Sequence, residues 1–228
     1  MFKKLNNIGD CGVVCDFGDA VNRSINTNVI KLFHHIKKEV SKGNLEGVLN
    51  YTPSYNKLII NFDLEKINSS KIIDFLKSVD FSKINISQNS KKWTIPICYE
   101  FEMDLTNMSK TLKIEKDEII NIHLNTDFFI YMVGFVPGHP FMGDLNSKLF
   151  LNRLKTPRVK IPAGSVGIVE KFCNIYPYES PGGWNIIGRT PIKLFNKKDE
   201  SNPCLLSPGD SVKFKSISKK EFEKLNNE

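Results

Sequence analysis

The sequence has no long uninterrupted apolar run. A membrane-spanning helix needs about 20 consecutive apolar residues, whereas the longest apolar stretch, at residues 128–136, is interrupted by Gly134 and followed by Pro137. The amino-terminal segment has lysines but no apolar segment behind them and no small-residue cleavage site, unlike a secretory signal. These absences exclude a membrane-spanning protein, and we expect a cytoplasmic one.

Metal-binding and redox patterns are also absent. The five cysteines, an odd number, include no C-x-x-C pair, and the four histidines include no H-E-x-x-H motif. We therefore expect reduced, mostly buried thiols and no metal site.

The charge is dispersed and not concentrated in one stripe. Lys and Arg number 32 against 25 Asp and Glu, but the lysines occur as scattered doublets without interleaved aromatic residues. This pattern argues against nucleic acid as a partner, and the net charge of +7 is compatible with a small anionic substrate.

Three common catalytic signatures are missing as well. A G-x-x-x-x-G match at residues 138–143 is followed by Asp144 and Leu145 where a Walker A loop needs Lys and Ser/Thr. Neither Ser165 nor Ser180 lies in a G-x-S-x-G elbow. No G-x-G-x-x-G follows a predicted strand. These absences argue against P-loop nucleotide enzymes, serine hydrolases and dinucleotide enzymes.

Hydrophobic periodicity predicts a small mixed domain in the first 90 residues. Short apolar or alternating runs predict strands at residues 12–17, 47–51, 58–62 and 84–86. Apolar residues at helical spacing predict two helices, with Asn26 or Thr27 as the N-cap of the first and Ser69 or Ser70 as that of the second. The order β-α-β-β-α-β predicts a ferredoxin-like domain over residues 1–90.

The pattern changes after a polar, lysine-bearing segment at residues 87–92, which is typical of a linker. One helix is predicted at residues 116–124, and short strands at 93–99, 128–133, 167–169, 186–187, 191–195 and 212–215. Many short strands separated by Gly and Pro predict a barrel or sandwich over residues 91–228. The expected fold class is α+β with two domains.

Three glycine- and proline-rich segments are the candidates for chemistry. They read GFVPGHPFMGDL at residues 134–145, PRVKIPAGSVGI at 157–168 and IYPYESPGGWNIIGRTP at 175–191. Glycine allows close backbone approach, so that consecutive N–H groups can converge on an anion, while proline fixes a loop. Each segment alone can be a tight barrel corner. Three of them in one half of the chain, with arginines beside them, favour a binding cleft.

These segments, together with LLSPGDSVKF from residue 205 and weaker motifs such as TPSY at residues 52–55, resemble the family of 5-oxoprolinase B subunits. That family is also known as allophanate hydrolase subunit 1 and includes the kinase inhibitor KipI. The resemblance covers nearly the whole chain. It implies a small α/β domain followed by a cyclophilin-like β-barrel. It also implies partners, the A and C subunits of 5-oxoprolinase, and an assembled complex that binds ATP and opens 5-oxo-L-proline to L-glutamate.

Two stretches depart from the family pattern. This chain has PGHPFMGD at residues 137–144 where members usually read PGFPYLGG, and FCNIYP at residues 172–177 where members usually read QTGIYP. Asn174 can adopt the positive φ of the glycine that it replaces. The loss of the Gln-Thr pair removes two hydrogen-bonding groups, so the identity of the substrate stays open.

The resemblance and the chemistry of a lactam together give a site hypothesis. Negative charge that develops on oxygen needs N–H donors and a guanidinium fork, and we assign catalytic roles to Arg158, Arg189 and Ser165. Substrate binding is assigned to residues of the same three segments, namely Pro137, Gly138, His139, Gly164, Gly167, Ser180, Pro181, Gly182, Gly183 and Trp184.

Structural roles stay open for several of these residues. Arg189 can instead pair with a carboxylate such as Glu179, and Trp184 can belong to the core or to a subunit interface. His139 is expected to be an exposed loop side chain. No catalytic base is evident, so we expect this chain to be inactive alone.

Two functions compete. The first is an enzyme subunit in the ATP-coupled opening of a cyclic amide, with another amide or a urea-derived compound as the alternative substrate. The second is a KipI-like module that binds a sensor histidine kinase and inhibits it.

Overall fold

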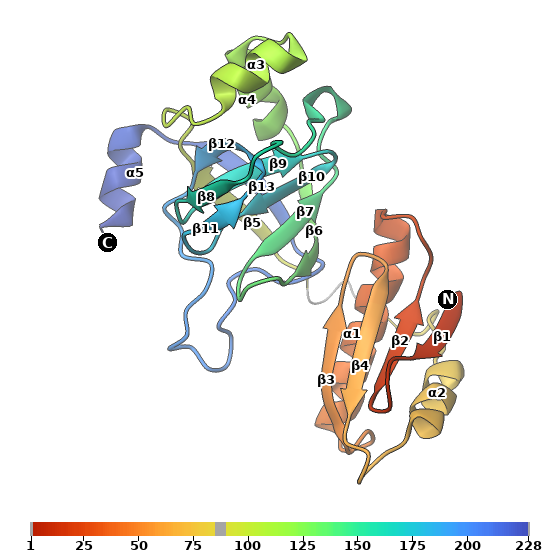
Figure 1. Cartoon of the computed structure of the whole chain (residues 1–228). Coiled ribbons are helices and arrows are strands. Elements are labelled where there is room, and N and C mark those ends of the chain that lie inside the picture. The colour runs from red at the N-terminus through yellow and green to blue at the C-terminus, as the bar shows by residue number, and fades with distance from the viewer. Residues whose placement is uncertain (1, 85–89, 228) are drawn as a thin grey trace. The chain divides into compact units, whose positions relative to one another are not determined.

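The chain forms two compact units, residues 1–90 and residues 91–228, in a computed structural model that describes residues 2–84 and 90–227 (Figure 1). Each unit has a hydrophobic core of its own. Within the described residues, no helix combines the length and the apolar character that crossing a membrane requires.

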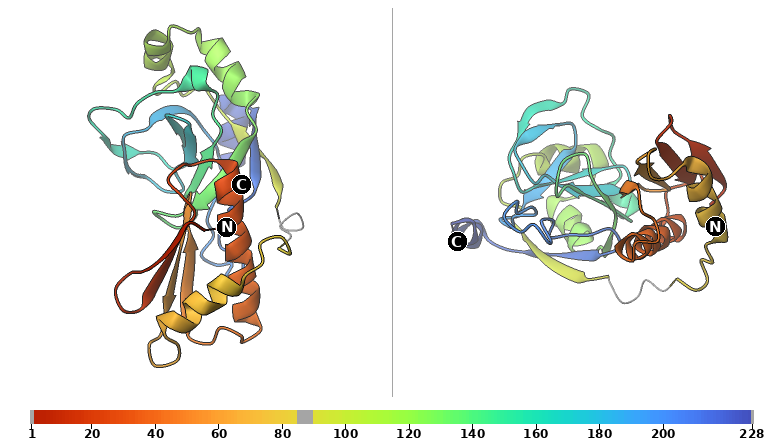
Figure 2. Two further views of the ribbon diagram at one scale, coloured as in Figure 1. Left: turned by 90° about the vertical axis from the view of Figure 1, so that its right-hand side faces the viewer. Right: turned by 90° about the horizontal axis from the view of Figure 1, so that it is seen from below.

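The first unit is a four-stranded antiparallel sheet with two helices packed against one face (Figure 2). Its elements are β1 (Lys4–Asn7), β2 (Gly12–Asp16), α1 (Arg23–Ser41), β3 (Val48–Pro53), β4 (Lys57–Phe62) and α2 (Ser69–Ser78), and the strand order is β1-β2-β4-β3. Alternate side chains of the central strands, such as Val13 and Ile60, share one core with Leu32 of α1 and Leu76 of α2. Because strand side chains alternate between faces, this shared core puts both helices on the same side of the sheet.

The strand order of this unit differs from the prediction. The strand β1 was not predicted, since Leu5 is its only apolar residue and it has no alternating pattern; it pairs with β2 at the edge of the sheet. Of the predicted strand at residues 84–86, Ile84 lies in no strand and residues 85–86 lie outside the described part of the chain. The described order is therefore β-β-α-β-β-α, and the ferredoxin-like order is not confirmed.

The two helix N-caps also differ from the prediction. Asn22 and Asn68 cap α1 and α2, and each side-chain oxygen accepts a hydrogen bond from the backbone N–H three residues on, at 2.9 and 3.0 Å. Asn26 is instead fully buried, and its amide donates to the carbonyls of Ser54 and Tyr55 at 3.1 and 2.9 Å. Asn26 thus ties α1 to the loop between β3 and β4.

The second unit is built on a seven-stranded sheet that curls into a nearly closed barrel. Its elements are β5 (Lys92–Ile97), α3 (Leu105–Leu112), α4 (Lys116–Leu124), β6 (Phe128–Val133), β7 (Pro140–Gly143), the 3-10 helix η1 (Ser147–Leu149), β8 (Arg158–Ile161), β9 (Ser165–Val169), β10 (Phe172–Ile175), β11 (Ser180–Gly182), β12 (Asn185–Arg189), β13 (Ser211–Ser216) and α5 (Lys219–Asn226). The strand order is β12-β9-β10-β7-β6-β13-β5, with β11 and β8 as a separate pair. The two ends of the sheet meet at Cys98 and Arg189, whose backbone groups exchange hydrogen bonds of 2.8 and 2.9 Å. The barrel expected for this half is confirmed in this coarse form.

One predicted strand of the second unit is wrong. Residues 191–195 form no strand, and Phe195 makes only an isolated bridge with Cys204. The apolar run there is short and begins with a proline, which lacks the N–H that a strand ladder needs.

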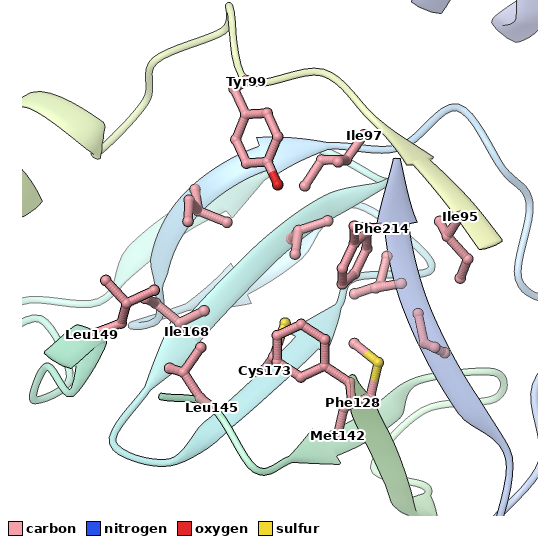
Figure 3. Close-up of a cluster of buried hydrophobic side chains, with 14 of the residues drawn as sticks. Ile95, Ile97, Tyr99, Phe128, Met142, Leu145, Leu149, Ile168, Cys173 and Phe214 are labelled. Carbon is pink, nitrogen blue, oxygen red and sulfur yellow. The ribbon is translucent and has the colours of Figure 1, made fainter. Parts of the chain in front are cut away.

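Apolar side chains fill the barrel interior. Figure 3 shows Phe128, Met142, Cys173 and Phe214 pointing into this core. A hydrogen-bonded chain crosses it, because His123 contacts the Tyr99 hydroxyl through Nδ1 at 2.8 Å and the Cys173 sulfur through Nε2 at 3.7 Å. Burial lowers the pKa of His123 to about 3 and raises the pKa of Cys173 well above its usual value. Both side chains are therefore neutral at pH 7.

Candidate functional site

The three glycine- and proline-rich segments contribute neighbouring strands of the barrel sheet and also the separate strand pair β8 and β11. The first segment contains β7, the second contains β8 and most of β9, and the third contains β10's last residue, β11 and β12. In the sheet, β7 lies next to β10, β10 next to β9, and β9 next to β12. Residues far apart in sequence, such as Phe141 and Asn174, are therefore direct partners in the sheet.

A buried polar cluster, formed by His139, Asn174 and Tyr176, lies where these strands meet. The amide nitrogen of Asn174 lies 3.0 Å from His139 Nε2. The imidazole stacks on the ring of Phe141, with 4.7 Å between centroids, and packs against the ring of Tyr176 at 5.3 Å. Phe141 in turn meets Trp184 edge-on at 6.2 Å. The structure thus brings two predicted residues, His139 and Trp184, together with three that were not predicted to act.

Two of the predicted glycines leave room for this cluster. A Cβ on Gly167 would lie 2.9 Å from both Asn174 Oδ1 and Trp184 Cβ. A Cβ on Gly182 would collide with the Tyr176 hydroxyl. Both glycines therefore act through packing, by allowing polar side chains to approach the backbone.

The expectation that His139 is exposed is wrong. Its side chain is nearly completely buried, because β7 begins directly after it and the rings of Phe141 and Tyr176 cover it. Burial lowers the pKa of His139 to about 4, so the imidazole is neutral at pH 7. A neutral imidazole has one donor and one acceptor nitrogen. Since the Asn174 amide donates to Nε2, the proton is assigned to Nδ1.

Two polar atoms of the cluster have no hydrogen-bond partner among the described residues. These are His139 Nδ1, a donor in this tautomer, and Asn174 Oδ1, an acceptor. Burial also raises the pKa of Tyr176, an effect opposed by the Asn174 amide and by the positive charges of Arg153 and Arg158. The cluster therefore combines an unused donor and an unused acceptor with two guanidinium groups in electrostatic reach of the phenol.

Arg158 forms a largely buried ion pair with Asp104. The other carboxylate oxygen of Asp104 accepts a hydrogen bond from the Ile186 N–H at 2.7 Å. One guanidinium nitrogen of Arg158, Nη1, is buried and has no partner among the described residues. One nitrogen of the Arg158 guanidinium is therefore occupied by Asp104 and the other is not. Asp104 was not identified from the sequence because no motif surrounds it.

Arg189 occupies a different environment. Its Nη2 donates to the carbonyl of Ala163 at 3.1 Å, and its guanidinium lies 4.9 and 5.3 Å from the ring centroids of Phe101 and Phe222. Burial lowers its pKa. The alternative of a pair with Glu179 is not seen, because Glu179 pairs with Lys160 at 3.3 Å. Arg158 and Arg189 thus have separate partners and do not share one carboxylate.

The N–H groups that were expected to face an anion are partly used inside the barrel. Gly164 donates to the carbonyl of Tyr176 at 2.8 Å, and Ser165 donates to that of Pro162 at 3.2 Å. The Ser165 hydroxyl is completely buried and has no partner in the described part of the chain. It is not accessible as a nucleophile in this conformation.

The remaining predicted residues lie at the edge of the cluster or on the surface. Pro137 and Pro181 are exposed, and Ser180 and Gly182 belong to β11, which pairs with β8. Gly138 packs under Phe195. The Gly183 carbonyl accepts a hydrogen bond from the Leu154 N–H at 2.8 Å. In the residues that the structure describes, no three His, Cys, Asp or Glu side chains are grouped so that they could hold a metal ion.

Comparison with known proteins identifies the family. A family model for the carboxyltransferase domain, subdomain C and D, matches residues 3–206. The chain is 33% identical to a Bacillus subtilis protein named as the B subunit of 5-oxoprolinase, over 96% of this chain and 95% of the relative. A Haemophilus influenzae protein of the same name is 43% identical over 53% of this chain and 57% of the relative. The chain therefore belongs to the family of 5-oxoprolinase B subunits, as its motifs predicted.

The solved structure of the protein TTHA0988 has a similar fold. It matches 92% of this chain with a TM-score of 0.82 and 26% sequence identity. The present chain spans only 40% of that longer chain.

Proposed function

We propose that this chain is the B subunit of an ATP-dependent 5-oxoprolinase complex, which opens 5-oxo-L-proline to L-glutamate together with A and C subunits. The observation that carries this proposal is the end-to-end similarity to the Bacillus subtilis 5-oxoprolinase B subunit, at 33% identity. We infer that the barrel is of the cyclophilin-like kind. The relatives named above give no support to the alternative of a kinase inhibitor.

The chemistry of a lactam explains why such a complex needs ATP. The amide is resonance-stabilised and a poor electrophile, and ATP bound by the complex would supply phosphoryl transfer to the amide oxygen, with release of ADP and then of phosphate. The glycine-rich segments of this chain do not fit a triphosphate, because the N–H groups of Gly164 and Ser165 are used internally and Arg158 is paired with Asp104. We therefore assign ATP binding to a partner subunit.

Recognition of the amide is the role that we assign to the polar cluster in this chain. A lactam has a C=O acceptor and an N–H donor, and among the described residues the cluster has a buried donor without a partner at His139 Nδ1 and a buried acceptor without a partner at Asn174 Oδ1. Leaving such buried groups unpaired costs about 1–3 kcal/mol each, which a bound amide would recover. We infer that the amide reaches the cluster from the side of Phe135. This residue is 80% exposed, and its ring lies 6.0 Å from the His139 ring.

A substrate panel tests this proposal. The complex purified with candidate A and C subunits is supplied with ATP and either 5-oxo-L-proline, urea or allophanate, and the release of ADP is measured. We expect ADP and glutamate release with 5-oxo-L-proline alone. ATP hydrolysis that depends on a urea-derived compound and not on 5-oxo-L-proline contradicts the proposed substrate. Inhibition of a sensor kinase by this chain, with no turnover by the complex, would favour the regulatory alternative.

A further inference from the structure

A groove lies between the end of α3 and the segment at residues 150–155, and one of its lining residues, Arg153, is also one of the positive charges that act on Tyr176 of the buried polar cluster. Its volume is about 610 Å³. The side chains that matter for its chemistry are Leu112, Phe150, Arg153, Lys155, Glu170 and Asn185. None of the residues assigned to the site from the sequence lines this groove.

The segment that forms one wall of the groove is irregular but fixed. Residues 150–154 have no helix or strand structure. Three hydrogen bonds nevertheless attach it to the barrel: the Leu151 carbonyl accepts from the Glu170 N–H at 2.7 Å, the Asn152 carbonyl accepts from the Asn185 amide at 3.0 Å, and the Leu154 N–H donates to Gly183 at 2.8 Å. An ordered loop on a rigid scaffold is the usual setting of a binding site.

The two cations on this segment have no acidic partner. Arg153 and Lys155 make no ion pair with any residue that the structure describes. Their neighbours in sequence differ, because Arg158 pairs with Asp104 and Lys160 pairs with Glu179. Arg153 and Lys155 thus bring to the groove two positive charges that have no acidic partner among the described residues.

A buried amide supplies a hydrogen-bond acceptor beside these cations. Asn185 is 6% exposed, and its Nδ2 donates to the carbonyls of Asn152 and Ile168 at 3.0 and 3.2 Å. Both donor hydrogens are therefore used inward, which leaves Oδ1 as the atom that Asn185 presents to the groove. Glu170 adds a carboxylate at the same surface.

We propose that this groove binds a small ligand that carries a carboxylate and an N–H or ammonium donor, as an amino acid or its lactam does. The carboxylate meets Arg153 and Lys155, and the nitrogen donor meets Asn185 Oδ1 and Glu170. A guanidinium suits a carboxylate because its N–H groups match the spacing of the two oxygens. Leu112 and Phe150 provide apolar contact for the carbon skeleton.

Titration of the full-length chain, followed by NMR of labelled backbone amides, tests the proposal. The probes are L-glutamate, 5-oxo-L-proline and 2-pyrrolidinone, which has the lactam ring without the carboxylate. We expect the first two to shift signals of residues 150–155 and of Asn185, with a dissociation constant on the order of 1 mM for so open a site, and 2-pyrrolidinone to leave them unchanged.

Two variants distinguish binding at this groove from a general effect of positive charge on the ligand. Arg153→Ala should weaken the binding of L-glutamate by about tenfold or more, because it removes a charge-assisted hydrogen bond. Lys160→Ala, which removes a nearby charge that is already paired with Glu179, should leave the affinity unchanged. Equal losses in both variants, binding of 2-pyrrolidinone at the same residues, or no shift at the groove with any probe would each overturn the proposal. These outcomes do not depend on turnover by the complex, so failure here leaves the proposed function standing.

Discussion

Burial determines the protonation state of two histidines in the barrel unit. His139 and His123 are held neutral, with pKa values lowered to about 4 and about 3 by desolvation. In the unfolded chain each imidazole has a pKa of about 6.5. Below that pH the unfolded state binds more protons than the native state, so stability falls as the pH falls from about 6.5 toward the folded values.

The pH dependence of stability tests this description. Between pH 7 and pH 5.5, each of the two histidines should lower the free energy of unfolding by about 1 kcal/mol. The variant His139→Phe should lose less stability over this range than the native chain, by about that amount, because it has one imidazole fewer. Urea denaturation at both pH values measures the difference. An unchanged pH dependence in the variant would show that His139 is not held neutral by burial.

Two glycines with the same φ differ in their surroundings. Gly164 and Gly43 both have a φ of 78°. A Cβ on Gly164 collides with the Thr190 carbonyl oxygen, whereas a Cβ on Gly43 has no atom within 4 Å. We expect Gly43→Ala to cost about 1–2 kcal/mol from backbone strain alone, and Gly164→Ala to cost more than about 3 kcal/mol. Equal losses in thermal or urea denaturation would contradict the packing seen at Gly164.

At the scale of elements, α5 is a short helix with few attachments to the barrel: the Lys219 N–H donates to the Glu100 carboxylate at 3.1 Å, and Phe222 packs inward. Phe222 is its only buried residue, and its ring meets the Phe101 ring at 4.9 Å and lies over Arg189. A helix of eight residues is not stable alone in water. Its structure therefore depends on docking, and docking covers an arginine that the site hypothesis had assigned to catalysis.

Hydrogen exchange tests this attachment. Phe222→Ala should release α5 and raise the exchange rates of the amides in residues 219–226 by one to two orders of magnitude, roughly the loss expected for a buried aromatic ring. Leu225→Ala is the matched control, because Leu225 is 39% exposed, and it should change these rates little. Similar effects of both substitutions would mean that α5 is not held by Phe222.

The elements that could be predicted are those with a distinct apolar pattern. The predicted bounds of α4 and β6, residues 116–124 and 128–133, agree with the structure, because α4 has clustered apolar residues between polar ones and β6 is a short continuous apolar run that ends before Gly134. The short strands β7 and β11 contain proline and glycine in three or four residues and have no measurable period. Contacts between distant residues were also unpredictable. The partners of Arg189, for example, come from positions 101 and 222 and are brought to it only by barrel closure.

For the whole molecule, the similarity to a 5-oxoprolinase B subunit and the match of this chain to 40% of the longer TTHA0988 chain support a role within a larger assembly. We propose that the buried cluster supplies recognition groups and that partner subunits supply the phosphate-binding groups, because the N–H groups of Gly164 and Ser165 are used internally and Arg158 is paired with Asp104. On this proposal the chain is an obligatory subunit.

The most direct test is ATP-dependent glutamate release from 5-oxo-L-proline by this chain mixed with its candidate A and C subunits, with each component omitted in turn. We predict full activity with all three and none when this chain is left out, with recovery on adding it back. Undiminished glutamate release in its absence would contradict the account.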